Sequence, residues 1–331
     1  MEEKVLGFTK YPPFQLNKPR FPQDSFLGRY LYYLDVIDPR TLLLSQEKVA
    51  ESLELLKTYS ANPKTSAIPN EELWKAQKVK QAIYHPDTGQ KIFPAFRMSG
   101  FVPFGWITGL VTGMLLPNPS WPTLLFWQWA NQSHNACVNY ANRNATKEQP
   151  FQIYVKAYAA AVLAAVGVSS GLTYVIRNAN SLSPAKKLII QRFVPLPATS
   201  LASTLNVLCM RGPELETGID VYEDNGKCIG TSKVAAKRAV TETAITRAFL
   251  PVPLLLIPPC IMPFLERIKV IQRRPAVHLL VNAVVCTISF GFSLPIALAL
   301  FPQTSSIAVS DLEKELQKNT TDSVLYYNKG L

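Results

Sequence analysis

The chain divides into a polar N-terminal part and six apolar runs, each close to the length of a membrane-crossing helix. No Asp, Glu, Lys or Arg occurs from Met98 to Asn142, a stretch long enough for two crossings at about 20 residues each. The runs are Ser99–Pro117, Phe126–Arg143, Ala157–Ile176, Leu188–Met210, Ala248–Leu265 and Val277–Phe301. Several are broken by prolines, and the fifth holds so many that it need not cross. The pattern predicts a mostly α, polytopic helical membrane protein with five or six membrane runs.

The second run carries a stripe of carboxamides that ordinary lipid-facing sequence lacks. In a helix the amides would share one face, because they recur at three- and four-residue steps. The stripe consists of Gln128, Asn131, Asn135, Asn139 and Asn142. An amide that faces hydrocarbon is costly unless it is hydrogen-bonded. The stripe predicts either hydrogen bonds between helices or a polar pathway for a solute, and its density favours the pathway.

Other runs add small, polar and helix-breaking residues. The third run is rich in Ala and also holds Gly167 and Gly171, which predicts a face that packs closely against another helix. Asn206 in the fourth run is a further candidate for the polar pathway. Prolines inside membrane helices leave backbone groups free, which indicates either a solute site or a local kink.

Residues 1–97 have the pattern of a soluble, mostly helical region. Ser45 and Asn70 are expected to cap two helices with apolar residues on one face. The second helix must end near His85, because Pro86 disfavours helical geometry at the residue before it. His85, Asp87 and Thr88 then lie in a tight turn, where the first two could form an acid–base pair. We favour the alternative that Asp87 and Thr88 only bond local backbone.

A polar insert, residues 211–247, separates membrane runs one to four (98–210) from runs five and six (248–303). Its alternating pattern around Asn225-Gly226 predicts a small hairpin with a type I′ turn. In the last segment, residues 304–331, the sequence Ser310–Glu313 matches a capping box and predicts a short helix followed by a tail.

Composition and charge agree with a membrane protein that has a soluble part. Hydrophobic residues make up 48% of the chain and charged residues 17%. The net charge of +11 is spread over short segments between the runs, as in loops that flank spans, so no nucleic-acid partner is expected. The five cysteines and three histidines have no ligand spacing, and no nucleophile–base pair or phosphate loop occurs. We therefore expect no metal, no cofactor and no catalysis.

Charged and titratable groups near the amide stripe are candidates for handling a solute. Arg143, Arg192, Arg211 and Arg247 lie near run ends, where they could attract carboxylates or simply anchor the helices at the interface. His134 falls off the stripe by helical phase. It could titrate during transport or form a hydrogen bond between helices.

Motifs along nearly the whole chain resemble the sideroflexin family of mitochondrial carriers. They are DPR at 38–40, ELWKAQ at 72–77, HPDTG at 85–89, RMSG at 97–100, FWQWANQSHNACVNYANRNATK at 126–147, RFVP at 192–195, FPQ at 301–303 and YNKGL at 327–331. His134, Cys137 and the ANRNATK ending look most like a branch described as a tricarboxylate or citrate carrier, whereas other branches tend to have Phe in place of His134.

The resemblance implies a multi-pass helical protein of the inner mitochondrial membrane. The acidic N-terminus separately predicts that there is no cleavable presequence. The resemblance also implies that the chain, with the lipid bilayer around it, transports a small carboxylate such as citrate. A neutral amino acid is the second expected substrate. A membrane scaffold that assists assembly of a respiratory complex remains the non-transporting alternative.

Overall fold

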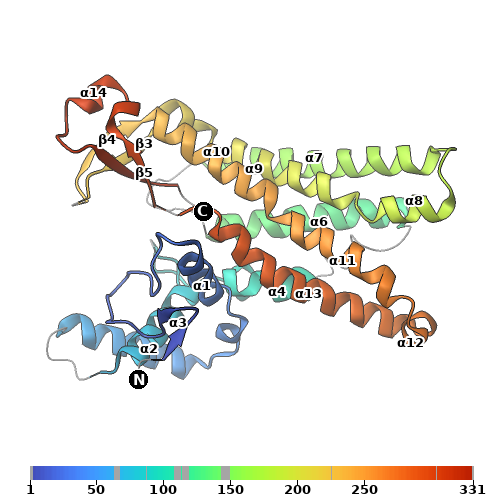
Figure 1. Ribbon diagram of the computed structural model, residues 1–331, viewed down its shortest axis with the longest axis horizontal. Helices are drawn as coiled ribbons and strands as arrows, with labels where there is room; N and C mark the ends of the chain where they lie inside the picture. Colours follow the sequence, from blue (N-terminus) through green and yellow to red (C-terminus); the bar gives the residue numbers. More distant parts are fainter. Residues whose placement is uncertain are drawn as a thin grey trace. The chain divides into compact units, whose positions relative to one another are not determined.

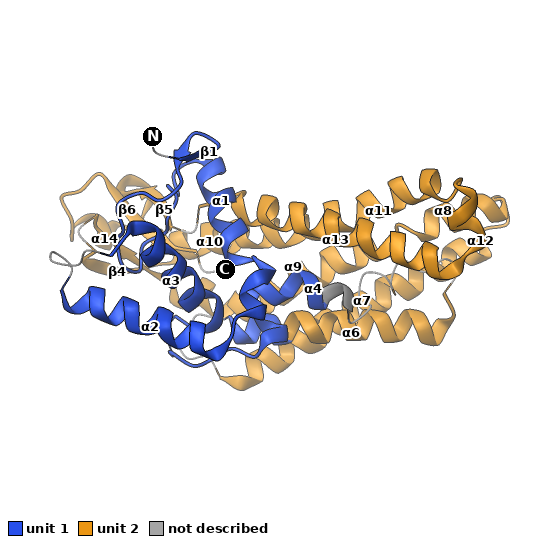
Figure 2. Ribbon diagram, turned by 90° about the horizontal axis from the view of Figure 1, so that it is seen from below, with its two compact units in different colours: residues 1–108, 137–147 blue, residues 109–136, 148–331 orange. Residues whose placement is uncertain are grey.

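The computed structural model describes residues 3–62, 68–86, 88–107, 113, 119–142, 150–224, 226–302 and 304–329, and most of them are helical (Figure 1). The chain forms two compact units (Figure 2). The first unit contains residues 1–108 and 137–147, and the second contains residues 109–136 and 148–331. The fold is that of a helical membrane protein, as the apolar runs predict.

The first unit is a small helical body. Its helices are α1 (Phe26–Val36), α2 (Gln46–Ala61), α3 (Asn70–Ile83) and α4 (Met98–Ile107), with a short hairpin, β1 (Lys4–Val5) and β2 (Phe8–Thr9), at its start. Ser45 caps α2 as predicted, accepting a hydrogen bond from the Lys48 N–H. The prediction for Asn70 was wrong, because Pro69 is the N-cap of α3. The Asn70 side chain accepts instead from the Phe14 N–H at 3.0 Å, and this bond ties the segment around Phe14 to the start of α3.

The DPR motif stabilises the start of a 3-10 helix, η1 (Pro39–Leu43). Asp38 is the cap of this helix, accepting from the Arg40 N–H, and its carboxylate also pairs with the side chains of Arg40 and Lys78, each at 2.6 Å. Burial alone would raise the pKa of Asp38, but the hydrogen bonds from Arg40 and Lys78 hold it well below its usual range. The motif therefore ties η1 to α3 and has a structural role.

The second unit consists mainly of long helices. They are α6 (Trp121–Ala141, whose last turn belongs to the first unit), α7 (Phe151–Asn178), α8 (Pro184–Gln191), α9 (Pro195–Thr217), α10 (Lys233–Phe249), α11 (Pro251–Leu265), α12 (Lys269–Arg273) and α13 (Pro275–Ala299). Among the described residues, four helical stretches are long and apolar enough to cross a membrane. They are Phe151–Asn178, Pro184–Thr217, Lys233–Leu265 and Pro275–Ala299.

These four stretches cover the predicted runs three to six, except for the last two residues of run six. The fifth run forms α11 directly after α10, with Pro258, Pro259 and Pro263 inside the helix. Its prolines therefore do not prevent a helical stretch long and apolar enough to cross a membrane, although each one removes a backbone N–H from the helical ladder. The second run forms α6, which is not among the four apolar stretches, and much of the first run lies outside the described residues.

The two helices α7 and α9 pack along a line of small side chains. On α7 the buried positions recur every four residues: Ala157, Ala161, Ala165, Ser169 and Thr173. Ala198 and Ala202 are fully buried on α9. The predicted close packing of this helix is confirmed at its alanines but was wrong for Gly167 and Gly171, because both glycines are exposed and a Cβ there would meet nothing within 4 Å. Alanine is already small enough for close approach, so the glycines are not needed at the contact.

Replacing Ala165 by Leu should destabilise the protein, whereas Gly167→Leu on the opposite face should not. Ala165 is 0% exposed, so a larger side chain would force the helices apart at a cost of about 1–3 kcal/mol. Thermal unfolding of both variants in detergent checks this. Equal melting temperatures would show that α7 does not pack through its buried alanines, Ala157, Ala161 and Ala165.

A four-stranded antiparallel sheet lies within the second unit, with strand order β4-β3-β6-β5. The strands are β3 (Ile219–Tyr222), β4 (Cys228–Ser232), β5 (Thr304–Ala308) and β6 (Val324–Asn328). The predicted hairpin is confirmed as β3–β4. Its turn differs from the predicted type I′, because the Glu223 N–H donates to the Lys227 carbonyl and so three residues, not two, lie between them.

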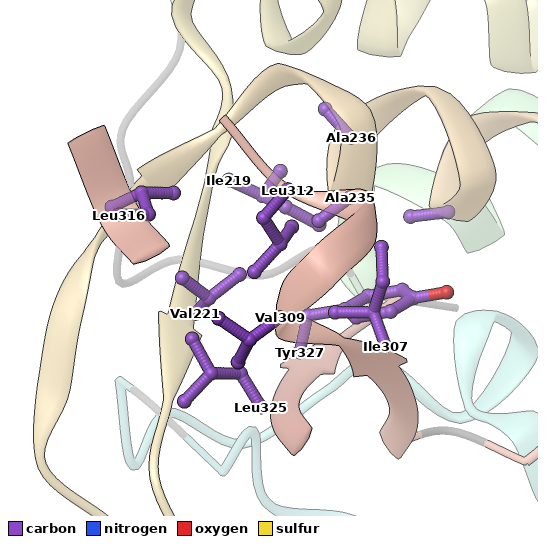
Figure 3. Close-up of a cluster of buried hydrophobic side chains, with 11 residues drawn as sticks. Ile219, Val221, Ala235, Ala236, Ile307, Val309, Leu312, Leu316, Leu325 and Tyr327 are labelled. Carbon is purple, nitrogen blue, oxygen red and sulfur yellow. The ribbon is translucent and has the colours of Figure 1, made fainter. Parts of the chain in front are cut away.

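The C-terminal segment contains the predicted short helix, and it also forms the strands β5 and β6, which the sequence did not predict. Ser310 lies in a 3-10 helix, η3 (Val309–Asp311), and the helix that follows, α14, covers only Lys314–Gln317. Glu313 accepts hydrogen bonds from the Lys233 and Val234 N–H groups, so the capping-box carboxylate serves α10 instead. The buried side chains between sheet and helices, shown in Figure 3, include Val221, Ala235, Ala236, Ile307, Leu325 and Tyr327.

Candidate functional site: the amide face of α6 and the paired ends of the bundle

Helix α6 has a polar buried face and an aromatic exposed face. Gln128 is 1% exposed and Asn131 is 7% exposed. The exposed side chains include those of Phe126, Trp129 and Tyr140. The face that the three- and four-residue spacing marks as polar is therefore turned inward, and the bulky aromatic residues are turned outward.

Several amide groups on the buried face have no hydrogen-bond partner within the described parts of the chain. They are both polar atoms of the Gln128 side chain, Nδ2 of Asn131 and Nε2 of Gln132. A buried polar group left without a partner costs about 1–3 kcal/mol, so such groups are normally satisfied by water or by a bound molecule. Sequence reasoning missed Gln132, although it lies four residues after Gln128 and three before Asn135 and so has the same helical spacing as the stripe.

Toward its C-terminal end the stripe becomes less buried and takes on a structural contact. Asn135, Asn139 and His134 are half-buried. The Asn142 amide nitrogen donates to the carbonyls of Phe96 and Val138, both at 2.8 Å and both within the first unit. Asn142 therefore has a structural role, because its side chain links two backbone segments by hydrogen bonds.

Helix α6 runs antiparallel to α7, and contacts at both ends of its second-unit part hold the two helices together. The hydroxyls of Ser133 and Tyr158 lie 2.8 Å apart. The Arg177 guanidinium, at the end of α7, donates to the Pro119 carbonyl and lies over the Trp121 ring at 4.9 Å. Figure 1 shows the two helices side by side.

A second set of buried polar groups lies on the packed faces of α7 and α9. Ser169 and Thr173 are 0% exposed, Thr199 is 6% exposed, and the three hydroxyls have no partner among the residues that the structure describes. Asn206, predicted from the sequence, is buried on the same face of α9. Sequence reasoning missed the hydroxyls, although Ser169 and Thr173 continue the four-residue period of the buried alanines.

Two of the predicted carboxylate-attracting arginines already have carboxylate partners in the chain. Arg192 donates to both oxygens of Glu266 at 3.0 Å, and His278 Nε2 lies 3.0 Å from the same carboxylate. Arg211 pairs with Glu214 and also donates to the Thr243 hydroxyl.

Of the other two predicted arginines, only Arg247 is among the described residues. Arg247 lies in the last turn of α10. Arg143 lies outside the described residues.

The Arg192–Glu266–His278 cluster joins the ends of α8, α11 and α13. Burial raises the pKa of Glu266, but hydrogen bonds from His278 and Arg192 outweigh it and hold the pKa below the ordinary value of 4.5. A lowered carboxyl pKa contributes stability that is present above the ordinary value and is lost as the pH falls through the lowered one.

We expect Glu266→Gln to lower the melting temperature by about 1–3 °C at pH 7, since a partly exposed ion pair contributes at most about 1 kcal/mol. The difference from the unaltered protein should shrink as the pH falls below 4.5. Melting curves at pH 7 and pH 3 check this, with the exposed Glu216→Gln as control. A difference that persists at the acidic pH would show that the ion pairs are not its source.

The HPDTG turn is held by local hydrogen bonds. The Thr88 N–H donates to His85 Nδ1 at 3.3 Å, and the Gly89 N–H donates to the His85 carbonyl at 2.9 Å. Gly89 has φ +66°, a conformation that favours glycine. Asp87 lies outside the described residues, so the acid–base alternative is untested. The contacts of His85 and Thr88 support the structural interpretation.

Comparison with known proteins places the whole chain among similar sequences. Residues 15–331 match the family described as sideroflexins. The chain is 66% identical to Sideroflexin-5 of Caenorhabditis elegans, over 100% of the chain and 99% of that relative. It is 51% identical to Sideroflexin-5 of Homo sapiens (97% and 94% covered) and 38% identical to Sideroflexin-3 of Homo sapiens (96% and 99% covered). No solved structure matches the chain.

Proposed function

The chain belongs to the sideroflexin family, and we propose that it transports a small polar metabolite bearing a carboxylate across the inner mitochondrial membrane. Family membership and the four apolar helical stretches support a multi-pass membrane transporter rather than an enzyme. The observation that carries the proposal is the set of buried amide groups on α6 that lack a protein partner among the described residues.

Carboxamides suit a transport pathway because each supplies a neutral donor and a neutral acceptor. A carboxylate passing along the face could accept hydrogen bonds from Gln128, Asn131 and Gln132 without a fixed counterion that would hold it too tightly. The less buried Asn135 and Asn139 would extend the same face. The buried hydroxyls on α7 and α9 offer further donors of the same neutral kind.

Citrate or a related carboxylate is the first proposed substrate, through the resemblance of the His134-containing motif to the citrate-carrier branch. One observation favours a neutral amino acid as the second. Arg192 and Arg211 are already paired with Glu266 and Glu214, whereas a tricarboxylate would be expected to need more than one cation that is not already paired. Neutral amides match a zwitterion with no excess charge.

A non-transporting scaffold in respiratory-complex assembly is the alternative of another class. The contact of Asn142 with the Phe96 carbonyl favours it, because there the stripe forms a structural hydrogen bond.

Competition for uptake into liposomes separates these functions. Purified full-length protein is reconstituted, and uptake of labelled citrate and of labelled serine is measured, each with unlabelled citrate, malate, serine or alanine as competitors. We expect saturable uptake that citrate and malate compete for. Uptake blocked only by serine and alanine would assign the amino-acid substrate, and no uptake of either class above protein-free liposomes would support the scaffold.

A further inference from the structure

The two short helices α8 and α12 lie at the same end of the second unit. α8 connects α7 to α9, and α12 connects α11 to α13 (Figure 1). The ion pair between Arg192, at the C-cap of α8, and Glu266, at the C-cap of α11, holds the two connections together. α8 begins the apolar stretch Pro184–Thr217, and α12 lies between the stretches that end at Leu265 and begin at Pro275, so both helices lie at the ends of stretches that could cross a membrane.

Several large apolar side chains on and beside these two helices are exposed, which is unfavourable if the surface meets only water. Ile189 is 55% exposed, Ile268 is 50% exposed and Val270 is 56% exposed. Leu188, Ile190 and Phe264 beside them are also exposed. Grouped aliphatic side chains of this kind at the end of a span are typical of segments that lie in the interfacial layer of a membrane.

The same segments are strongly basic. Residues 177–192 and 266–274 hold eight Lys and Arg but a single acid, Glu266. That acid is occupied by Arg192 and His278. In the part of the chain that the structure describes, Lys186, Lys269, Arg273 and Arg274 are exposed and form no ion pair.

The opposite end of the second unit has a different charge balance. Residues 211–242 and 304–329, which include the sheet, hold eight Lys and Arg and ten Asp and Glu. Excess positive charge is thus concentrated at the α8 and α12 end and is absent from the sheet end.

We propose that α8 and α12 form a binding surface for the headgroups of anionic phospholipids. The aliphatic side chains would enter the acyl boundary, and the exposed cations around them would meet lipid phosphates. An acidic protein partner fits less well, because large aliphatic side chains lie among the cations at the level where the spans end. The inference does not depend on whether the protein transports a solute.

Thermal unfolding of the full chain in vesicles of stated composition tests the surface. Phosphatidylcholine vesicles are compared with vesicles that also contain phosphatidylglycerol. Two variants are matched in charge change: Lys186→Gln/Lys269→Gln/Arg273→Gln/Arg274→Gln on the proposed surface, and Lys233→Gln/Lys237→Gln/Lys314→Gln/Lys318→Gln at the sheet end, where the four lysines are also exposed.

We expect phosphatidylglycerol to raise the melting temperature of the unaltered chain and of the sheet-end variant by about 3 °C. The α8/α12 variant should lose most of this gain, since each cation removed should weaken binding about fivefold. High salt should reduce the gain in the unaltered chain as well. Equal gains in all three proteins, or no gain in any, would overturn the proposal.

Lipid retention supplies a second test that needs no variant. The unaltered protein is purified from membranes, and its bound lipids are identified by mass spectrometry before and after a high-salt wash. Enrichment of anionic over zwitterionic lipid that the wash removes supports the surface. Equal retention of both classes contradicts it, as does binding of an acidic polypeptide such as polyglutamate without any preference among lipids.

Discussion

Replacing Asn135 or Asn139 by leucine is expected to abolish uptake into liposomes while leaving membrane insertion intact. Each change removes the donors and the acceptor of one amide and puts a similarly sized apolar side chain in their place. Loss of one hydrogen-bonding group toward a solute is worth about 1–3 kcal/mol, so even partial loss should exceed about fivefold. Uptake is measured per inserted protein, with orientation determined by protease protection.

The matched control is Gln152→Leu, which makes the same kind of change at an exposed position on α7. It should insert and transport like the unaltered chain. If both asparagine variants also insert and transport normally, the α6 face is not the pathway, and the amides are better explained as contacts between helices.

Replacing Leu325 by Ala should produce the largest loss of stability among the single changes considered. Leu325 lies on the central strand β6, is 0% exposed and belongs to the cluster in Figure 3. Truncating a fully buried leucine costs about 2–5 kcal/mol, because it removes apolar burial and leaves a cavity. Thermal and denaturant unfolding of the full chain measure the effect.

Ser306→Ala on the neighbouring strand β5 is the control, because this side chain is exposed. A Leu325→Ala protein as stable as this control would mean that the C-terminal strand does not build the core of the second unit.

The long apolar runs could be predicted because membrane helices are specified locally. Run three became α7, and run six became α13, from length and composition alone. The cap at Ser45 could be predicted for the same reason, since its side chain accepts from the N–H of Lys48, only three residues later. The β3–β4 hairpin could be predicted because its two strands are close in sequence.

The sheet could not be predicted beyond that hairpin. Val221 pairs with Tyr327, more than 100 residues away, and no local pattern marks such partners. Glu313 shows the same limit, because its capping-box spacing is genuine but the sheet brings it to the start of α10. The glycines of α7 misled for another reason: Ala165 serves the close contact, and Gly167 faces outward.

The candidate site was predictable where helical phase decides it. The three-residue step from Gln128 to Asn131 placed both on the buried face of α6. Phase could not show that Arg192 meets Glu266, 74 residues later, and so lies in an ion pair instead of standing free. The unpaired hydroxyls of α7 and α9 depend on which helices pack together, which the sequence does not state.

The most direct test of the α6 pathway is protection of a cysteine at position 138 by the transported solute. Val138 is 4% exposed, lies three residues after Asn135 on the amide face in the last turn of α6, and carries no amide, so Val138→Cys leaves the stripe itself intact. The five native cysteines are first replaced by serine. The control is Leu163→Cys on α7, because Leu163 is 74% exposed. We predict that a charged, water-soluble thiol reagent modifies Val138→Cys in reconstituted protein, that the solute slows the reaction, and that Leu163→Cys does not respond to the solute. A Val138→Cys protein that transports but never reacts, or reacts at one rate with and without solute, would contradict the account.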